Sequence, residues 1–162
     1  MMSMPWTGMA RLREGYRALV IGSSGGIGQA CLQALRADPR CAEVQGVSRG
    51  QPGAWDLTDA VSLVTLAAQL PGPWHLVVDA TGALTLDGQG PEKRLQELQA
   101  DRLLHNLQVN AVGPALLLQQ LSPQLARGER VLFVCDKRTA LDVVKYRLDA
   151  VGLGDLSGVV HD

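Results

Sequence analysis

The chain has 162 residues, a formal net charge of −1, 46% hydrophobic residues and 19% charged residues. This length fits one domain that can bury a core without disulfides or a structural metal, and the composition excludes a disordered chain. The small net charge provides no field for nucleic acid, and 4% aromatic residues provide no stacking platform for single strands.

Cysteine use and the N-terminal residues predict a cytoplasmic protein with no membrane partner. The three cysteines (Cys31, Cys41 and Cys135) are odd in number and lack metal-ligand spacing, so we expect free thiols and no metal site. No apolar run approaches the roughly 18 residues that a membrane helix needs, and the first ten residues lack the apolar core of a signal peptide. Residues 1–14 are expected to be a leader of little structural consequence, and 15–162 a single domain.

Apolar runs and helical patterns alternate along the chain. Strands are predicted at 17–21, 43–48, 54–56, 75–79 and 130–135. Helices are predicted from the glycine loop to Arg36, over 60–70 with Thr58 or Asp59 as cap, over about 92–121 with a break at Gly113-Pro114, and over 139–151. This alternation predicts an α/β fold: a three-layer, Rossmann-type, doubly wound parallel sheet of five strands in the order 3-2-1-4-5.

A glycine-rich loop joins the first predicted strand to the first predicted helix. Its residues are Gly22, Ser23, Ser24, Gly25, Gly26, Ile27 and Gly28. Glycine accepts the positive φ of a tight turn and lets a pyrophosphate approach the backbone, and the helix N-terminus offers it N–H groups and a positive dipole end. The loop therefore predicts a dinucleotide-phosphate site; a glycine-rich turn without a ligand is the alternative.

This segment resembles the short-chain dehydrogenase/reductase family, whose usual pattern is Thr-Gly-x-x-x-Gly-x-Gly, with Ile21 at the threonine position. The resemblance covers about residues 15–125, and the run from Pro91 to Leu118 is most similar to the bacterial C-factor-like branch. It implies an NAD(P)-dependent oxidoreductase fold, a carbonyl or alcohol small molecule as substrate, and a homo-oligomer.

The end of the second strand indicates which dinucleotide is preferred. Ser48 and Arg49 lie about twenty residues past the loop, where an acidic residue would bind a ribose 2′-hydroxyl and an arginine suits a 2′-phosphate. Arg49 therefore favours NADP(H) over NAD(H), with a solvated loop arginine as the alternative.

Three further motifs match the family in order. Asp56-Leu57 matches an aspartate-hydrophobic pair whose aspartate meets the adenine, although a helix-capping aspartate is equally expected. Asp79-Ala80-Thr81-Gly82 stands where the family carries Asn-Asn-Ala-Gly; Gly82 still admits the cofactor, while Asp79 is expected to weaken the hydrogen bonds at the strand end. Asn110 matches an asparagine that the family uses in a water-linked proton relay, which makes it the candidate catalytic residue, or else a helix asparagine satisfied within the fold.

The family's catalytic tyrosine, lysine and serine have no counterparts. Tyr16 is followed four residues later by Val20, and Tyr146 by Ala150, so neither forms a Tyr-x-x-x-Lys pair. Without the lysine-activated proton donor and the serine that holds the substrate oxygen, we expect little or no carbonyl reduction.

Residues from about 126 to 162 no longer resemble a dehydrogenase. Residues 131–155 resemble the strand-helix piece around motif Ia of superfamily 1 helicases, but no Gly-x-x-x-x-Gly-Lys-Ser/Thr sequence is present to bind a triphosphate. A chimeric strand-helix unit over about 126–155 is expected to dock on the sheet, to damage the family's helix-pairing interface and to leave an apolar strip on Leu116–Leu121. A non-catalytic NADP-binding or chimeric structural module is thus the alternative to an impaired oxidoreductase, and a nucleic-acid-associated fragment comes last.

Overall fold

The computed structural model describes residues 12–51, 53–86, 88 and 90–133. The strands are β1 (Tyr16–Ile21), β2 (Cys41–Val47), β3 (Trp74–Asp79) and β4 (Leu125–Phe133). The α-helices are α1 (Gly26–Ala37), α2 (Ala60–Ala68), α3 (Ala100–Leu107) and α4 (Gly113–Leu121). Short helical turns occur at η2 (Leu95–Glu97), η3 (Gln108–Val112, a π-helical turn) and η4 (Ser122–Gln124).

The described strands form one parallel sheet in the order β2-β1-β3-β4. Ile21 of β1 is in register with Val47 of β2 and Asp79 of β3, and Asp79 is in register with Phe133 of β4. The carboxyl ends of all four strands therefore meet at one edge. The chain leaves β1 to one side and later returns to pair β3 on its other side, and ligands of open α/β sheets bind in the crevice at such a switch point.

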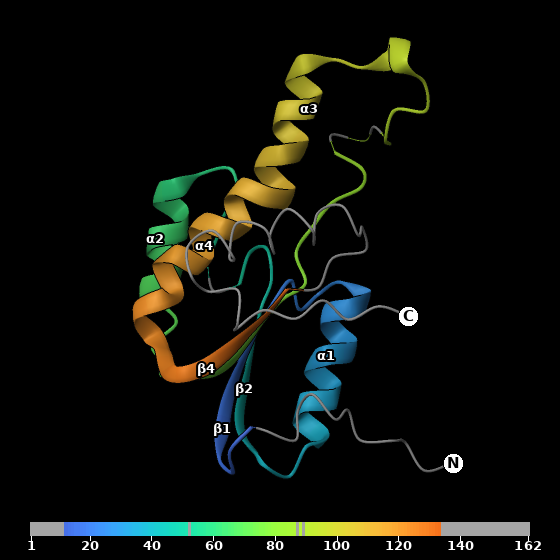
Figure 1. The fold of residues 1–162 in the computed structure, drawn as a ribbon. Coiled ribbons are helices and arrows are strands. Elements are labelled where there is room, and N and C mark those ends of the chain that lie inside the picture. The colour runs from blue at the N-terminus through green and yellow to red at the C-terminus, as the bar shows by residue number, and fades with distance from the viewer. Residues whose placement is uncertain (1–11, 52, 87, 89, 134–162) are drawn as a thin grey trace, which may run out of the picture.

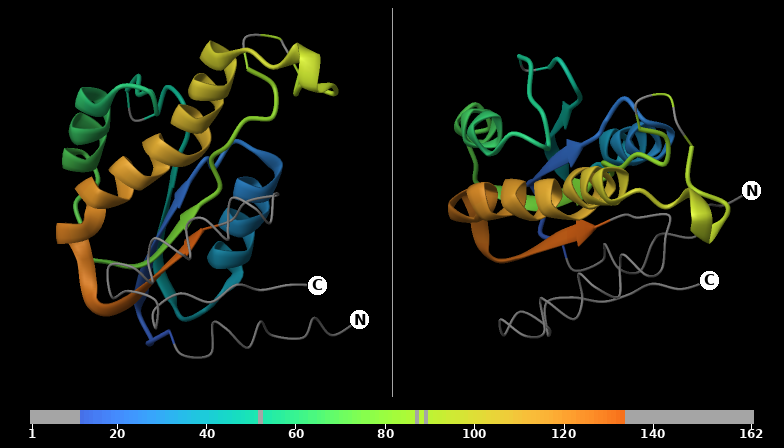
Figure 2. Two further views of the ribbon diagram at one scale, coloured as in Figure 1. Left: turned by 45° about the horizontal axis from the view of Figure 1, so that its top comes forward. Right: turned by 90° about the horizontal axis from the view of Figure 1, so that it is seen from above.

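Helices cover both faces of the sheet, which gives three layers. Figures 1 and 2 show α1 on one face and α2 with α4 on the other. Under α1 lies a core cluster that includes Tyr16, Val20 and Leu35. Under α2 and α4 lies a larger cluster that includes Leu63, Leu117 and Trp74. The alternation of β1 residues between the two clusters is the period of two expected of a strand buried on both faces.

Two sequence predictions fail near the edges of the fold. Residues 54–56 form no strand; Trp55 instead buries its ring in the larger cluster and donates its indole N–H to the Ser48 carbonyl at 2.7 Å. The described part of the chain therefore has four strands rather than five. Leu12, assigned to a leader of little consequence, is 7% exposed and packs in the cluster under α1.

The helical predictions that fall on described residues hold in outline. Asp59 caps α2 by accepting a hydrogen bond from the Val61 N–H, and α1 ends at Ala37. The long helix starts at Ala100 rather than near 92, and η3 interrupts it directly before Gly113-Pro114, as the glycine-proline pair predicted. The strip Leu116–Leu121 is not left open, because Leu117 and Leu121 are fully buried and Leu116 and Leu118 pack against the same cluster.

The predicted last strand forms and joins the sheet. β4 starts at Leu125, pairs in parallel with β3, and carries a register irregularity between the partners of Trp74 and Leu76. The predicted helix over 139–151, together with Cys135 and Tyr146, lies outside the described residues.

Candidate functional site

The glycine loop lies at the carboxyl edge of the sheet, between β1 and α1. The Gly22 and Ser23 N–H groups both donate to the Val47 carbonyl, at 2.8 and 2.9 Å, which ties the loop to the end of β2. Gly25 N–H donates to the Gly22 carbonyl at 3.0 Å and closes the turn. Gly46 makes room for this docking, because a Cβ there would lie 3.0 Å from Ser23 Oγ and 3.2 Å from Leu32.

Gly22 and Gly28 are required by the fold itself. Gly22 has a φ of +80°, and a Cβ there would lie 2.6 Å from the Ala80 carbonyl oxygen. A Cβ on Gly28 would overlap the Gly22 carbonyl oxygen. These two glycines therefore pack strand, loop and helix together whether or not a ligand binds.

Gly26 differs from them. It has no positive φ, and a Cβ placed there would meet no described atom within 4 Å. The chain itself thus gives no reason for glycine at the first position of α1, so the space beside it is open to a ligand. Ile27, the next residue, is 49% exposed.

The N-terminus of α1 offers donors. Gly25 at the N-cap makes no side-chain cap, and the first turn carries no acidic residue. The first N–H groups of a helix lack intrahelical acceptors, and the first bond of α1 is from Gln29 N–H to the Gly25 carbonyl at 2.8 Å. Since α1 has 12 residues, its dipole adds positive potential at this end. The arrangement suits an anion such as a phosphate.

The end of β2 is a tight turn with Arg49 at its tip. Ser48 N–H donates to the Gln51 carbonyl at 3.1 Å, Gln51 N–H donates to the Ser48 carbonyl at 2.9 Å, and Gly50 has a φ of +86°. Arg49 is exposed and follows the strand whose last carbonyl, that of Val47, holds the glycine loop. The structure thus brings Arg49 to the same edge as the glycine loop.

Asp56 and Leu57 lie in the loop that leads into α2. Asp56 Oδ1 accepts the N–H and the hydroxyl of Thr58, at 2.7 and 2.8 Å, and these bonds lower the pKa of Asp56, with smaller contributions from the positive charges of His105 and Arg49. Leu57 is half-buried against the larger core cluster and lies so close to α4 that a Cβ on Gly113 would overlap its carbonyl oxygen. Asp56 is therefore an exposed, turn-forming aspartate in the loop before α2.

The segment after β3 forms the opposite wall of the glycine loop. Ala80 N–H donates to the Ile21 carbonyl at 2.9 Å, and the Ala80 carbonyl is the group that excludes a side chain at Gly22. Asp79 Oδ1 accepts the N–H and hydroxyl of Thr81, at 2.9 and 2.6 Å. Gly82 follows in an extended, positive-φ conformation that brings it against Asn110.

Asn110 joins the π-helical turn to this wall. Its Oδ1 accepts the Ala83 N–H at 2.8 Å, and its Nδ2 donates to the Ala83 carbonyl and to Asn106 Oδ1, both at 3.0 Å. Both of its N–H donors are occupied within the chain. This favours the alternative given above, an asparagine satisfied within the fold.

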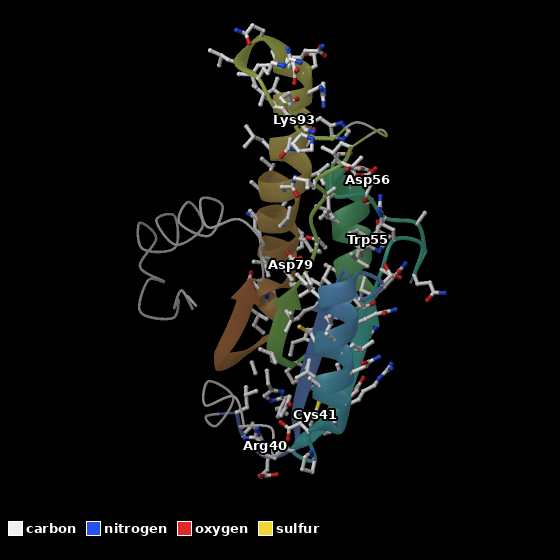
Figure 3. The ribbon with its side chains drawn as sticks, turned by 90° about the vertical axis from the view of Figure 1, so that its right-hand side faces the viewer. Arg40, Cys41, Trp55, Asp56, Asp79 and Lys93 are labelled. Atoms are coloured by element: carbon white, nitrogen blue, oxygen red, sulfur yellow. The ribbon has the colours of Figure 1, made fainter. Side chains whose placement is uncertain are left out.

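Figure 3 shows how the candidate residues divide between the two ends of the sheet. Asp56 and Asp79 lie toward one end, and Arg40 and Cys41 lie at the other. Tyr16, the other tyrosine besides Tyr146, starts β1 at that far end and is fully buried, with its hydroxyl donating to Asp38 Oδ2 at 2.9 Å. It is therefore far along β1 from the glycine loop.

Sequence reasoning missed the groups that dock the loops. Ser62 accepts the Asp56 N–H and donates to the Asp56 carbonyl, both at 2.9 Å, and Gln108 Nε2 donates to the Thr58 carbonyl at 3.0 Å. Neither residue has a spacing that marks it, since these partners come from separate elements. A shallow hollow of about 160 Å³ beside α3, lined by residues including Glu92, Arg102 and His105, was also not foreseen.

Solved structures share this fold, among them short-chain dehydrogenases. The protein lin1944 from Listeria innocua has a TM-score of 0.58 and 24% identity over 72% of this chain and 54% of its own length. A variant short-chain dehydrogenase/reductase from Serratia marcescens has a TM-score of 0.64 and 20% identity, covering 87% of this chain and 74% of its own. A small-chain dehydrogenase in complex with NADPH has a TM-score of 0.67 and 14% identity, covering 87% of this chain and 66% of its own.

The two dehydrogenase structures show that the chain has the fold of short-chain dehydrogenases/reductases. The chain spans little more than half the length of the Listeria protein. No protein-family model and no curated protein matches the sequence. Within the described residues, no helix is long and apolar enough to cross a membrane.

Proposed function

We propose that this chain is a short-chain dehydrogenase/reductase-type protein that binds NADP(H) at the carboxyl edge of its sheet, as one domain over residues 15–162. The observation that carries the proposal is the contrast among the loop glycines: Gly22 and Gly28 are explained by packing, whereas Gly26 borders open space at an uncapped helix N-terminus. A dinucleotide pyrophosphate is a ligand that would use both this space and the free N–H groups. The NADPH complex of a protein with the same fold supports this assignment.

We assign the two ends of the adenosine half to the neighbouring loops. Ser48 and Arg49 would hold the 2′-phosphate, because Arg49 is a fixed positive charge at the tip of the turn after β2. Asp56 and Leu57 would border the adenine. Ala80, Thr81 and Gly82 would form the wall on which the dinucleotide lies, since Ala80 and Thr81 stand directly across from Gly22 and Gly82 follows them in the chain.

We further propose that this chain, with the dinucleotide bound, catalyses little carbonyl reduction. Reduction needs a proton donor within roughly 2.6–3.2 Å of the substrate oxygen. Tyr16 is buried at the far end of the sheet, and Asn110 uses both of its amide hydrogens within the fold. Asn110 would then act by fixing the Ala83 backbone rather than by moving a proton. A carbonyl or alcohol small molecule stays the class of substrate for any residual activity, and a cytoplasmic location stays our expectation. The family resemblance is compatible with a homo-oligomer, but we expect the family's helix-pairing interface to be damaged in this chain.

The direct test is calorimetric titration of the chain with NADPH, NADH and ATP. We expect NADPH to bind more tightly than NADH, and ATP to bind least. Gly26→Val should abolish NADPH binding by filling the space that the pyrophosphate needs. Because a Cβ at this position meets no described atom within 4 Å, the variant should keep the wild-type unfolding midpoint.

The matched control is Gly90→Val, which changes a glycine with equally open surroundings in the loop before α3. It should leave NADPH affinity unchanged. Wild-type affinity in the Gly26→Val variant would show that the glycine loop is only a turn, and tightest binding of ATP would favour a different nucleotide site.

A further inference from the structure

Asp79 occupies an unusual position for an acidic residue. It is the last residue of β3, in the middle of the sheet, and is 2% exposed. Its register partner in β1, Ile21, and the residue two before it, Val77, both belong to the cluster beneath α2 and α4. Residues that share a register or lie two apart share a face of a sheet, so the Asp79 carboxyl enters this apolar layer.

The two carboxyl oxygens have different surroundings. Oδ1 accepts both hydrogen bonds from Thr81, while Oδ2 is buried and has no hydrogen-bond partner among the described residues. Burying a carboxylate without partners for both oxygens costs far more than burying the neutral acid. The geometry therefore favours a proton on Asp79.

No charged group among the described residues compensates this burial. α2, η3 and α4 contain no ionisable residue, and neither do Ile21 or residues 80–83. In the neighbouring strand β4, Phe133 is the register partner of Asp79, and the ionisable residues Arg127, Glu129 and Arg130 come three or more positions earlier. Further ionisable residues are Asp56 and Asp59 before α2 and Asp101, Arg102 and His105 on α3, and none of these charges moves the pKa of Asp79. Burial raises that pKa, and the two Thr81 donors offset the rise only in part.

The same segment carries one wall of the glycine loop. Asp79 holds Thr81, Ala80 N–H bonds to Ile21, and the Ala80 carbonyl lies against Gly22. An ionised Asp79 would leave the apolar layer for water, because Thr81 donates only to Oδ1 and no charge among the described residues compensates the buried Oδ2. That movement would shift Ala80 and Thr81 away from the loop.

We propose that Asp79 is a positioning residue that holds a proton in the folded chain, and that loss of this proton loosens residues 79–81 and weakens dinucleotide binding at the glycine loop. The binding half of this inference rests on the function proposed above. It makes cofactor binding fall as pH rises, with no titratable group on the ligand-facing surface required.

The first test is urea unfolding of the full chain from pH 4 to 9, without ligand. If Asp79 keeps its proton in the folded chain, its contribution to the folding equilibrium constant falls tenfold for each pH unit above the ordinary aspartate pKa. This fall ends at the pH where Asp79 also ionises in the folded form. Asp79→Asn should remove this decline, while Asp101→Asn, an exposed control on α3, should keep it. Equal pH profiles for wild type and Asp79→Asn would overturn the proposal.

Thr81→Val is a second test of whether Asp79 holds a proton, for the case that Asp79→Asn fails to fold. It removes the hydroxyl donor that stabilises the ionised carboxylate, so the decline should extend to higher pH than in the wild type. An unchanged or shortened decline would contradict a proton on Asp79.

The second test is NADPH titration at pH 6 and pH 8.5. Between these pH values, we expect the NADPH affinity of the wild type to drop at least threefold more than the NADPH affinity of Asp79→Asn. Comparison with this variant also corrects for the titration of NADPH itself. Equal drops would refute the coupling. Absence of NADPH binding in both proteins at both pH values would refute the proposed function and the coupling together, while the unfolding experiment still decides whether Asp79 holds the proton.

Discussion

The two ends of the sheet use polar groups in opposite ways. At the amino end, Tyr16 donates to Asp38, and Asp38 also accepts from the Arg40 backbone and guanidinium at 2.8 to 3.1 Å, so these groups satisfy one another. At the carboxyl end, the first turn of α1 is uncapped and Gly26 borders open space. A closed network stabilises a fold, whereas donors left without chain partners are available to a ligand. The comparison separates the end whose polar groups satisfy one another from the end at which we expect binding.

The largest effect should come from the glycines that serve packing at the binding end. Gly28→Ala places a methyl group onto the Gly22 carbonyl, which requires movement of backbone on both sides. We expect a loss of about 3 kcal/mol or more in unfolding free energy, the size of a severe core clash. Urea denaturation measures it. Gly26→Ala is the matched substitution and should cost less than about 0.5 kcal/mol; similar losses for both would break the distinction between packing and ligand glycines.

The next effect concerns selectivity rather than stability. Arg49→Ala should weaken NADPH binding by about 1.5–3 kcal/mol, the value of a charge-assisted contact, and should leave NADH binding nearly unchanged because NADH lacks the 2′-phosphate. Titration with both cofactors measures the difference. Arg36→Ala, at the last turn of α1, removes the same charge away from the proposed site and should affect neither. An equal loss of affinity for both cofactors would show that Arg49 attracts the dinucleotide by its charge alone and does not contact the 2′-phosphate.

The amino end should show the opposite pattern, with stability affected and binding untouched. Hydrogen bonds from Arg40 hold the pKa of Asp38 at about 2, below the ordinary value of 3.8. Because the folded pKa lies below the unfolded one, Asp38 adds stability above about pH 4, and this stability is lost as pH falls toward 2.

Asp38→Asn should therefore cost about 1–2 kcal/mol near pH 6 and progressively less below pH 4. Thermal unfolding between pH 6 and pH 2.5 measures this, and NADPH affinity at pH 7 serves as the control that should not change. A cost that stays constant down to pH 2.5 would show that the carboxylate charge is not what stabilises this end.

The smallest effect should come from Arg17, which links β1, β2 and the start of β3. Its Nε lies 2.8 Å from Glu43 Oε2, and its guanidinium stacks 4.7 Å from the Trp74 ring centroid. Arg17→Gln should cost about 0.5–1 kcal/mol, since exposed ion pairs and cation–π contacts are each weak. The share of this loss that comes from the ion pair with Glu43 should shrink at 1 M salt. A loss above about 2 kcal/mol would mean that this residue belongs to the closed network.

Local patterns were good guides to the elements. The runs at 17–21 and 75–79 have apolar centres, Ala18–Ile21 and Leu76–Val78, and became β1 and β3. Gly113-Pro114 interrupted the long helix as expected. The prediction of a strand over 54–56 was wrong. A three-residue strand would stabilise the fold less than the burial of the Trp55 ring in the core cluster does. Leu12 and the strip Leu116–Leu121 were misjudged for one reason: the packing partners of a side chain come from elements distant in sequence.

The sequence by itself determined the parallel α/β architecture and the glycine loop, because strand and helix periods, turn glycines and their spacing are local properties. The tertiary structure decided which glycines are needed by the fold and which border open space, since only the approach of Ala80 to Gly22 and of Gly28 to the loop makes that distinction. It also decided that Asn110 is satisfied by Ala83 and that Asp79 is buried with no charged partner among the described residues. Burial and partnership arise from atoms brought together by folding, and no spacing along the chain encodes them.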